Sequence, residues 1–298
     1  MNGEFVYLNP FLRSSVHESE IWAEEATGFT DVESIHAEMS EVLRRDLRTV
    51  ATYPQHPTRV RFLVGQGGAG KSHLFCRLRR QIGGEAIFAF ASNPPTRPAA
   101  LFRWTLDKIV YGLRHPRVVA GANFKHATFL AATTDKGLLP APFLTRFRMV
   151  DLVPYSAEEV AEILHPVFDH PVETDFLVRL AHMSRFNPRE ALVRAQELLT
   201  HHHFEASMYP LDLEGLRRMA SESWQVDERG LRPVDLRYLR ALQGGRRGLE
   251  ALTQLLPVGR DEIKTVIEPY LLQLELIRLS GAGRELSERG RRLITTPA

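Results

Sequence analysis

The sequence predicts an α/β fold in its first half, then an all-helical region, then a small C-terminal unit of three helices and a β-hairpin. Short apolar strand patterns alternate with helical patterns up to about residue 165, which favours a parallel sheet covered by helices on both faces. Beyond that residue the strand patterns stop. From about residue 226, three helical patterns precede two short strands, an arrangement typical of a winged helix.

The composition is that of an ordinary globular protein. The chain has 298 residues, of which 44% are hydrophobic and 25% charged, so it is neither disordered nor of low complexity. The formal net charge of +2 does not by itself indicate a nucleic-acid-binding protein. No apolar run reaches the length of a transmembrane helix, and the N-terminus lacks the pattern of a signal peptide. Because Cys76 is the only cysteine, a disulfide framework is excluded and a cytoplasmic protein is expected.

The helices and strands of the first half follow from the spacing of apolar residues. Apolar residues three or four positions apart predict helices over 31–50, 73–82 and 99–113. Short apolar runs predict strands over 60–64, 85–91, 127–133 and 149–153. Another helix is expected to begin after Ser156, since Ser156 and Glu159 have the spacing of a capping box.

The second half contains only helical patterns until the hairpin. Helices are expected over 174–184, 188–200, 211–223, 233–243, 248–256 and 261–276. Pro269 interrupts the last of these patterns, so a kink or break is expected there. The two strands of the hairpin flank Gly281-Ala282-Gly283. The predicted parts are an irregular segment over 1–30, an α/β core over 31–165, a helical lid over 166–224 and a winged helix over 225–298.

One motif in the core carries recognisable chemistry. From residue 65 the chain reads G-Q-G-G-A-G-K-S, a complete G-x-x-x-x-G-K-S between a strand and a helix, which is the context of a P-loop. The glycines let backbone N–H groups and the helix N-terminus face phosphate oxygens. Lys71 is expected to reach the β- and γ-phosphates of ATP, and Ser72 to hold Mg²⁺. The expected nucleotide-binding residues are Gly65, Gln66, Gly67, Gly68, Ala69, Gly70, Lys71, Ser72 and His73.

Beyond the P-loop, the chain resembles the AAA+ ATPases and, over about residues 126–298, the RuvB family of Holliday-junction branch-migration motors. The segment AATTDKGLL is similar to sensor 1 of that family. The resemblance implies that Thr133 or Thr134 binds the γ-phosphate or the attacking water. The segment PFLTRF is similar to the arginine-finger segment. The resemblance implies that Arg146 reaches a neighbour's nucleotide and neutralises charge on the transferred phosphoryl group.

The segment Asn187-Pro188-Arg189-Glu190 looks like sensor 2 of these ATPases. Asn187 is a good N-cap and Pro188 suits the first helical position, so a helix is expected to start here whatever its function. The resemblance implies that Arg189 points at the γ-phosphate and reports the state of the nucleotide to the lid.

The C-terminal unit is similar to the winged helix of RuvB. In the family this unit carries arginines that contact the DNA backbone, which implies the same role for Arg278, Arg284 and Arg289. The family's arginine just before the last glycine of the turn is Ala282 here. A winged helix that contacts a protein is the alternative.

One element of a P-loop ATPase is missing from the sequence pattern. An apolar strand that ends in acidic residues, the Walker B strand, normally lies between the P-loop and sensor 1 and positions Mg²⁺ and the attacking water. Between Glu85 and Asp135 the only acidic residue is Asp107, which lies inside a helical pattern. Asp135 and Asp151 are the nearest acids at strand ends, and neither fits the motif.

The leading hypothesis is an ATP-driven, RuvB-like motor that acts on branched DNA in recombination or repair. An arginine finger implies a homo-oligomeric ring, and the winged helix implies contacts with the DNA backbone that do not read sequence. A protein that loads the ring onto DNA junctions is a candidate partner. The missing acid supports a second hypothesis, a hydrolysis-poor module that binds DNA or protein under the control of ATP. A third is a transcription regulator whose winged helix reads a specific site; equal binding to unrelated duplexes would argue against it.

Overall fold

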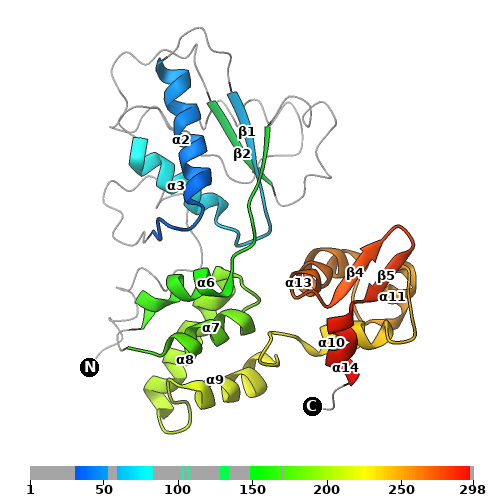
Figure 1. The fold of residues 1–298 in the computed structure, drawn as a ribbon. Coiled ribbons are helices and arrows are strands. Elements are labelled where there is room, and N and C mark those ends of the chain that lie inside the picture. Colours follow the sequence, from blue (N-terminus) through cyan, green and yellow to red (C-terminus); the bar gives the residue numbers. More distant parts are fainter. Residues whose placement is uncertain are drawn as a thin grey trace. The chain divides into compact units, whose positions relative to one another are not determined.

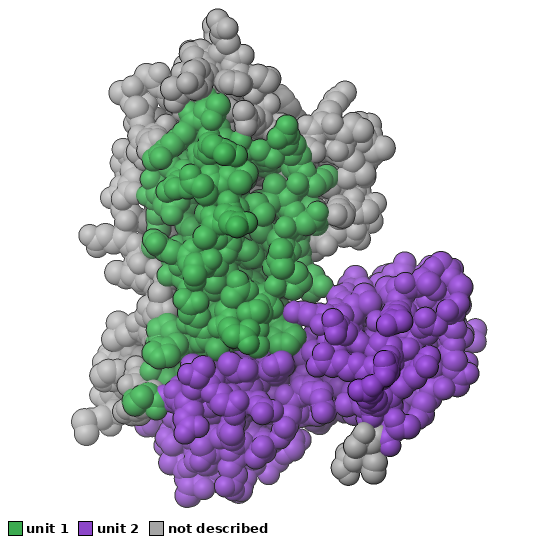
Figure 2. All heavy atoms as spheres, in the orientation of Figure 1, with its two compact units in different colours: residues 1–171, 186–196 green, residues 172–185, 197–298 purple. Residues whose placement is uncertain are grey.

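Figure 1 shows the computed structural model of the chain, which describes residues 31–52, 59–82, 128–133, 148–168 and 171–295 and the single helical residues Arg103 and Asp107. The chain forms two units, one of residues 1–171 with 186–196 and one of residues 172–185 with 197–298 (Figure 2). Within the described ranges, no helix combines the length and the apolar character that crossing a lipid bilayer requires.

A small parallel sheet lies at the centre of the first unit. Strand β1 (Arg59–Val64) runs between β2 (Thr128–Thr133) and β3 (Arg148–Asp151), so the strand order is β2-β1-β3. In the register of the sheet, Val64 lies beside Thr133 on one side and beside Asp151 on the other. The three strands therefore end at the same edge of the sheet. The P-loop begins at that edge, with the residue that follows Val64.

The core of the first unit lies between this sheet and the helices α2 (Ala37–Thr52) and α3 (Lys71–Ile82). Buried leucine and isoleucine residues recur every four positions along α3, which gives this helix one apolar face. That face meets side chains of α2, β1 and β3. The cluster includes Leu74, Leu78 and Ile82 of α3 with Leu43, Leu63 and Val150.

Helix α6 (Ala157–Leu164) and a 3₁₀ turn, η4 (His165–Val167), follow the sheet. The predicted capping box at the start of α6 is confirmed. Glu159 N donates to Ser156 Oγ at 3.1 Å, and Ser156 N donates to Glu159 Oε2 at 2.8 Å. Helix α8 (Pro188–Glu205) begins in the first unit and ends in the second.

The second unit is helical up to its C-terminal hairpin. It contains α7 (Thr174–Met183), α9 (Leu213–Met219) and a π-helical turn, η5 (Ala220–Trp224). The winged helix follows. Its elements are α10 (Pro233–Ala241), α11 (Leu249–Leu255), α12 (Arg260–Glu262), the π-helical turn η6 (Ile263–Ile267), α13 (Glu268–Gln273), β4 (Ile277–Ser280), β5 (Gly283–Leu286) and α14 (Glu288–Thr295). Strands β4 and β5 are antiparallel, and Arg247 pairs with Arg284 at the other side of β5.

Arg185 joins the chain after α7 to the winged helix, inside the second unit. Its guanidinium carbon lies 4.2 Å from the centre of the Tyr270 ring, and its Nη1 lies 3.5 Å from the fully buried carboxylate of Asp235. Its Nη2 donates to Val266 O at 3.0 Å. The Tyr270 hydroxyl donates to His182 O at 3.2 Å. These contacts tie the end of α7 to helices α10 and α13.

The predicted fold class, an α/β P-loop core with a parallel sheet, a helical lid and a winged helix, is confirmed. A kink or break is expected at Pro269, but the helical path continues through this residue and contains a π-helical turn directly before α13. Pro269 follows the π-helical turn η6, in which Glu268 N–H bonds to the carbonyl of Ile263, five residues earlier. A proline lacks the N–H group that an α-helix needs at this position.

Two of the described elements differ clearly from the predicted ones. The first helix begins at Ala37 and not at Asp31, because the preceding residues form a turn. Helix α14 has no counterpart among the predicted elements; Gly290 N donates to Ser287 Oγ at 3.0 Å and caps its first turn. The strand expected over 85–91 lies outside the described residues. Of the helix expected over 99–113, Arg103 and Asp107 are described, and both are helical and exposed.

Candidate functional site

The P-loop, residues 65–72, connects β1 to α3. The φ angles of Gly68 and Gly70 are 85° and 78°, in the left-handed region that favours glycine. A Cβ on Gly68 would lie 2.2 Å from Oδ1 of Asn187, and one on Gly70 would lie 2.2 Å from the hydroxyl oxygen of Tyr155. The backbone conformation therefore favours glycine at both positions, and the side chains of Asn187 and Tyr155 would have to shift to admit a Cβ.

Lys71 is the first residue of α3 and is half-buried. Its Nζ donates to the carbonyl oxygens of Gly65 and Gln66, each at 2.7 Å. Burial and the positive charge of Arg189 lower the pKa of Lys71. Ser72, the next residue, is exposed. An ammonium group and a hydroxyl thus stand at the N-terminus of a helix, where anions bind.

The start of α8 brings the sensor 2 segment to this loop. Asn187 caps the helix, since its Oδ1 accepts a hydrogen bond from Arg189 N at 3.0 Å. Its Nδ2 donates to Gly67 O at 3.3 Å. Arg189 is exposed and close enough to Lys71 to affect the pKa of that lysine. Two neighbouring cations repel each other, and a polyanion bound beside both of them would relieve that repulsion.

His73 lies against the turn that precedes α2. Its Nε2 is 2.9 Å from Oδ1 of Asp31. Arg77, which is 4% exposed, donates from Nε to Asp31 Oδ2 at 2.7 Å and from Nη1 to Ile35 O at 2.6 Å. Burial by itself would raise the pKa of Asp31, but the hydrogen bonds from His73 and Arg77 lower it to about 2. His73 thus helps to hold the turn, and its contact with a nucleotide stays a prediction.

Sequence reasoning missed two aromatic residues beside the P-loop, His36 and Tyr155. Their ring centres are 5.2 Å apart, and the buried Tyr155 is the neighbour that Gly70 accommodates. His36 has a φ of 55°, and its buried Nε2 has no hydrogen-bond partner among the described residues. Burial lowers the pKa of His36 and raises that of Tyr155 to about 12. The position of Tyr155, just past the end of β3, was the available sequence signal.

The structure describes the sensor 1 and arginine-finger residues only in part. Thr133 is the last residue of β2 and is in register with Val64, directly before the P-loop. The backbone therefore puts Thr133 at the phosphate-binding edge of the sheet. Thr134 and Arg146 lie outside the described residues.

The acid that a P-loop ATPase needs is not apparent in the described ranges. They contain no group of three or more His, Cys, Asp or Glu side chains that could hold a metal ion. Asp107 is helical and exposed, so it does not end a strand. Asp151 ends β3 beside Val64, and Asp135 lies outside the described residues. Among the described residues, Ser72 is the one that the P-loop motif predicts to hold a metal ion.

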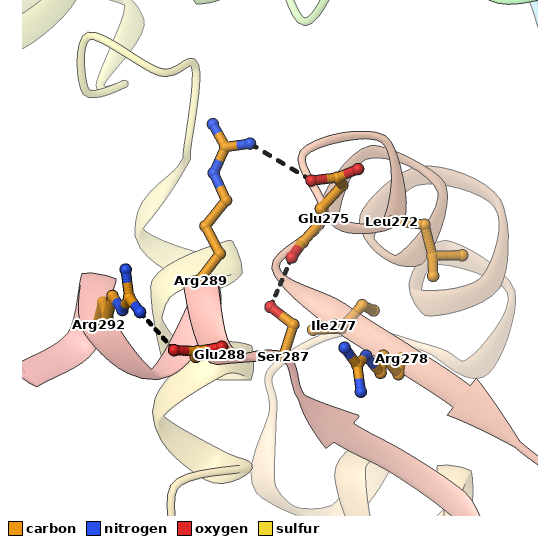
Figure 3. A pocket seen from close by; sticks show the side chains of 8 residues that line it. All are labelled: Leu272, Glu275, Ile277, Arg278, Ser287, Glu288, Arg289 and Arg292. Atoms are coloured by element: carbon orange, nitrogen blue, oxygen red, sulfur yellow. Dashed lines mark hydrogen bonds and ion pairs between the residues drawn. The ribbon is translucent and has the colours of Figure 1, made fainter.

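The winged helix carries a cavity of about 700 Å³ between α13, β4 and α14. Arg278, Arg289 and Arg292 line it, and all three are exposed (Figure 3). Arg289 is 3.7 Å from Glu275 and Arg292 pairs with Glu288, whereas no dashed line joins Arg278 to the other side chains of the cavity. These are surface ion pairs, which contribute little stability and exchange readily. Arg278 and Arg289 are therefore accessible to a phosphate backbone.

Arg284 is in a different environment from the other two predicted DNA-binding residues. Its Nε donates to Oε1 of Glu268 at 2.7 Å. Glu268 is 4% exposed and also accepts a hydrogen bond from the Tyr238 hydroxyl at 3.0 Å. The hydrogen bond to Glu268 raises the pKa of Arg284, and burial together with the charge of Glu268 raises the pKa of Tyr238. Arg284 therefore neutralises a buried carboxylate, and its contact with DNA stays a prediction.

The parallel sheet, the P-loop at the end of its central strand, the helical lid and the winged helix define an AAA+ protein. Comparison with known proteins gives the relationship within that class. Residues 228–295 match the RuvB C-terminal winged helix domain. Within that class, the chain is similar to RuvB.

The curated relatives are Holliday junction branch migration complex subunits RuvB. That of Gluconobacter oxydans is 35% identical over 182 residues, which cover 57% of this chain and 51% of the relative. That of Paramagnetospirillum magneticum is 33% identical over 174 residues, covering 55% and 49%. The chain thus spans about half the length of the curated relatives that it matches.

Solved structures of RuvB have the same fold. The Thermotoga maritima RuvB Holliday junction branch migration motor superimposes with a TM-score of 0.61 at 20% identity, covering 94% of this chain and 99% of the other. A mutant of that protein gives a TM-score of 0.66, with 93% and 99% coverage. At this identity the likeness shows the fold.

Proposed function

We propose that this protein is an ATP-driven motor on branched DNA, of the kind that its RuvB relatives are named for. The observation that carries the proposal is the hydrogen bond from Asn187 to Gly67, which brings the start of the Arg189 helix to the P-loop, in a chain whose winged helix matches that of RuvB. ATP is the nucleotide that the relatives' motor function implies. The proposed parts are a core over 31–165, a lid over 166–224 and a winged helix over 225–298.

Each proposed site residue has a distinct role. Lys71 binds the β- and γ-phosphates, and Ser72 holds the Mg²⁺ that accompanies ATP. Thr133 or Thr134 positions the γ-phosphate or the attacking water. Arg189 contacts the γ-phosphate from the lid side.

A homo-oligomeric ring is part of the proposal, since Arg146 would act on the nucleotide of a neighbouring copy. An arginine supplied in trans stabilises charge on the transferred phosphoryl group. In the winged helix, the exposed Arg278 and Arg289 are the residues proposed to contact the DNA backbone. A protein that loads the ring onto junctions is a further proposed partner.

A second function has one specific observation in its favour. No Walker B acid is apparent in the sequence pattern, and the described residues contain no acidic metal cluster. A module that binds ATP, changes its affinity for DNA or protein and hydrolyses ATP slowly would need no such acid. Binding of ATP without turnover is the behaviour that separates this function from the motor.

The test is ATP turnover by the purified chain with Mg²⁺, beside the variants Lys71→Ala and Arg146→Ala. Loss of the lysine should abolish measurable turnover, because the charge that it places against the β- and γ-phosphates is lost. Arg80→Ala is the matched control, because Arg80 is an exposed cation on the same helix. Loss of turnover in both site variants but not in the control supports an ATPase that acts as an oligomer. Measurable ATP binding with no turnover in the unmodified chain contradicts the motor and supports the module.

A further inference from the structure

We propose that Asn187 is a positioning residue for ATP. Its side chain fixes the orientation of the Gly67–Gly68 peptide in the P-loop and, at the same time, holds the backbone N–H of Arg189. The inference rests on the proposed nucleotide site and deepens it. It assigns to Asn187 a role beyond the N-cap that the sequence predicts. The ligand concerned is the triphosphate group of ATP.

Two hydrogen bonds use both ends of the Asn187 amide. Oδ1 accepts from Arg189 N at 3.0 Å, and Nδ2 donates to Gly67 O at 3.3 Å. The contact with Gly67 joins segments 120 positions apart in the sequence. The helix that carries Arg189 and the loop that carries Lys71 are thus connected through one planar amide.

The orientation of this amide is determined by its partners. If the oxygen and nitrogen were exchanged, an NH₂ group would face the N–H of Arg189, and the amide oxygen would face the carbonyl oxygen of Gly67. Donor would then meet donor and acceptor would meet acceptor. Only the arrangement present satisfies both ends, so asparagine acts here as a donor toward the P-loop and as an acceptor toward α8.

The bond to Gly67 fixes a group that binds phosphate. In a trans peptide the C=O and the following N–H point in opposite directions. Holding the Gly67 carbonyl toward Asn187 therefore directs the N–H of Gly68 away from it. Backbone N–H groups of this loop are the donors that a P-loop offers to phosphate oxygens. Asn187 consequently sets the direction of one of these donors.

The packing at Gly68 supports the same role. A Cβ on that residue would lie 2.2 Å from Oδ1 and 2.8 Å from Cγ of Asn187. The loop therefore approaches the asparagine as closely as a glycine allows. An N-cap alone needs only the bond to Arg189 N and would not require this approach.

Substitution separates capping from positioning. Aspartate and serine cap helices as well as asparagine does. The aspartate carboxylate, however, cannot donate a hydrogen bond to Gly67 O. Serine has a hydroxyl in place of the carboxamide and therefore lacks the NH₂ group that donates to Gly67 O. We would measure ATP affinity by titration calorimetry with Mg²⁺ and thermal unfolding without nucleotide, for the full chain and for Asn187→Ser and Asn187→Asp. Thr200→Ser, farther along α8, is the control for a conservative substitution in this helix away from the P-loop.

Asn187→Ser should bind ATP about tenfold more weakly, which is the effect of losing one well-placed hydrogen bond. Asn187→Asp should bind more weakly still, because its carboxylate repels both the Gly67 carbonyl and the phosphates. The unfolding temperature should stay within a few degrees of that of the unmodified chain. Equal ATP affinity in all four proteins would overturn the inference and leave the proposed function in place. Absence of ATP binding by the unmodified chain would overturn both.

Discussion

At the P-loop and in the winged helix, arginines predicted to bind phosphate have opposite surroundings. Arg189 is exposed and stands near a second cation, Lys71, whose pKa it helps to lower. Arg284 is largely buried and stands against the carboxylate of Glu268 at 2.7 Å. A cation beside a cation favours an incoming anion, whereas a cation already paired with a buried carboxylate does not. We therefore propose that Arg189 serves nucleotide binding, whereas Arg284 serves folding.

Replacing Arg284 should have the largest effect on stability. Arg284→Met would leave the buried Glu268 without its cation, and breaking such a pair destabilises a protein by about 3 kcal/mol or more. The measurement is urea unfolding of the full chain. Arg278→Met, in the same hairpin but exposed, is the control and should shift the free energy of unfolding by less than about 0.5 kcal/mol. Equal effects of the two substitutions would remove the contrast between Arg284 and the surface arginines.

Acid should weaken the turn before α2 through Asp31. The pKa of this carboxyl is lowered from 3.8 to about 2 in the folded chain. The folded state thus binds fewer protons than the unfolded state, so the stabilisation is complete above about pH 4 and is lost as the pH falls toward 2. The shift corresponds to about 2 kcal/mol. In urea unfolding, Asp31→Asn should be less stable than the unmodified chain at pH 7, and the difference should shrink between pH 4 and pH 3. A difference that does not vary with pH would contradict the role of the His73 and Arg77 hydrogen bonds.

The smallest expected effects are those of the exposed arginines on DNA binding. Arg278→Gln and Arg289→Gln should each weaken binding to a duplex several-fold, and each should reduce the slope of log affinity against log salt concentration by about 1. Arg179→Gln, a partly exposed position on α7 whose side chain is 42% exposed, is the control. If Arg284→Gln alone reduces the salt slope, the assignment of DNA contacts to the exposed residues is wrong.

The sequence predicted the parts of the fold that depend on local pattern. Spacing within a few residues predicts the P-loop, the strand before it and the capping box of Ser156 and Glu159. The structure has all three. The register that sets Thr133 beside Val64 follows once two parallel strands are known to share an edge. Local pattern and the topology of a parallel sheet therefore accounted for the location of the candidate site.

What the sequence could not predict depends on contacts between distant residues. Glu268 lies in a helical pattern that does not reveal its burial beneath Arg284. His36 adopts a positive φ, which is uncommon for residues other than glycine, and nothing in the neighbouring sequence predicts it. Asn187 was identified as an N-cap, but its bond to Gly67 links segments 120 positions apart. Such contacts arise from tertiary packing and have no local signal.

The central claim is that nucleotide turnover at the P-loop serves a DNA-binding winged helix. The most direct measurement is the rate of ATP hydrolysis by the full chain with Mg²⁺, with and without a synthetic four-way DNA junction, beside Lys71→Ala. The account predicts that the junction raises the rate several-fold and that the lysine variant shows neither basal nor stimulated turnover. Turnover that is the same with and without DNA, or that survives in Lys71→Ala, would contradict it.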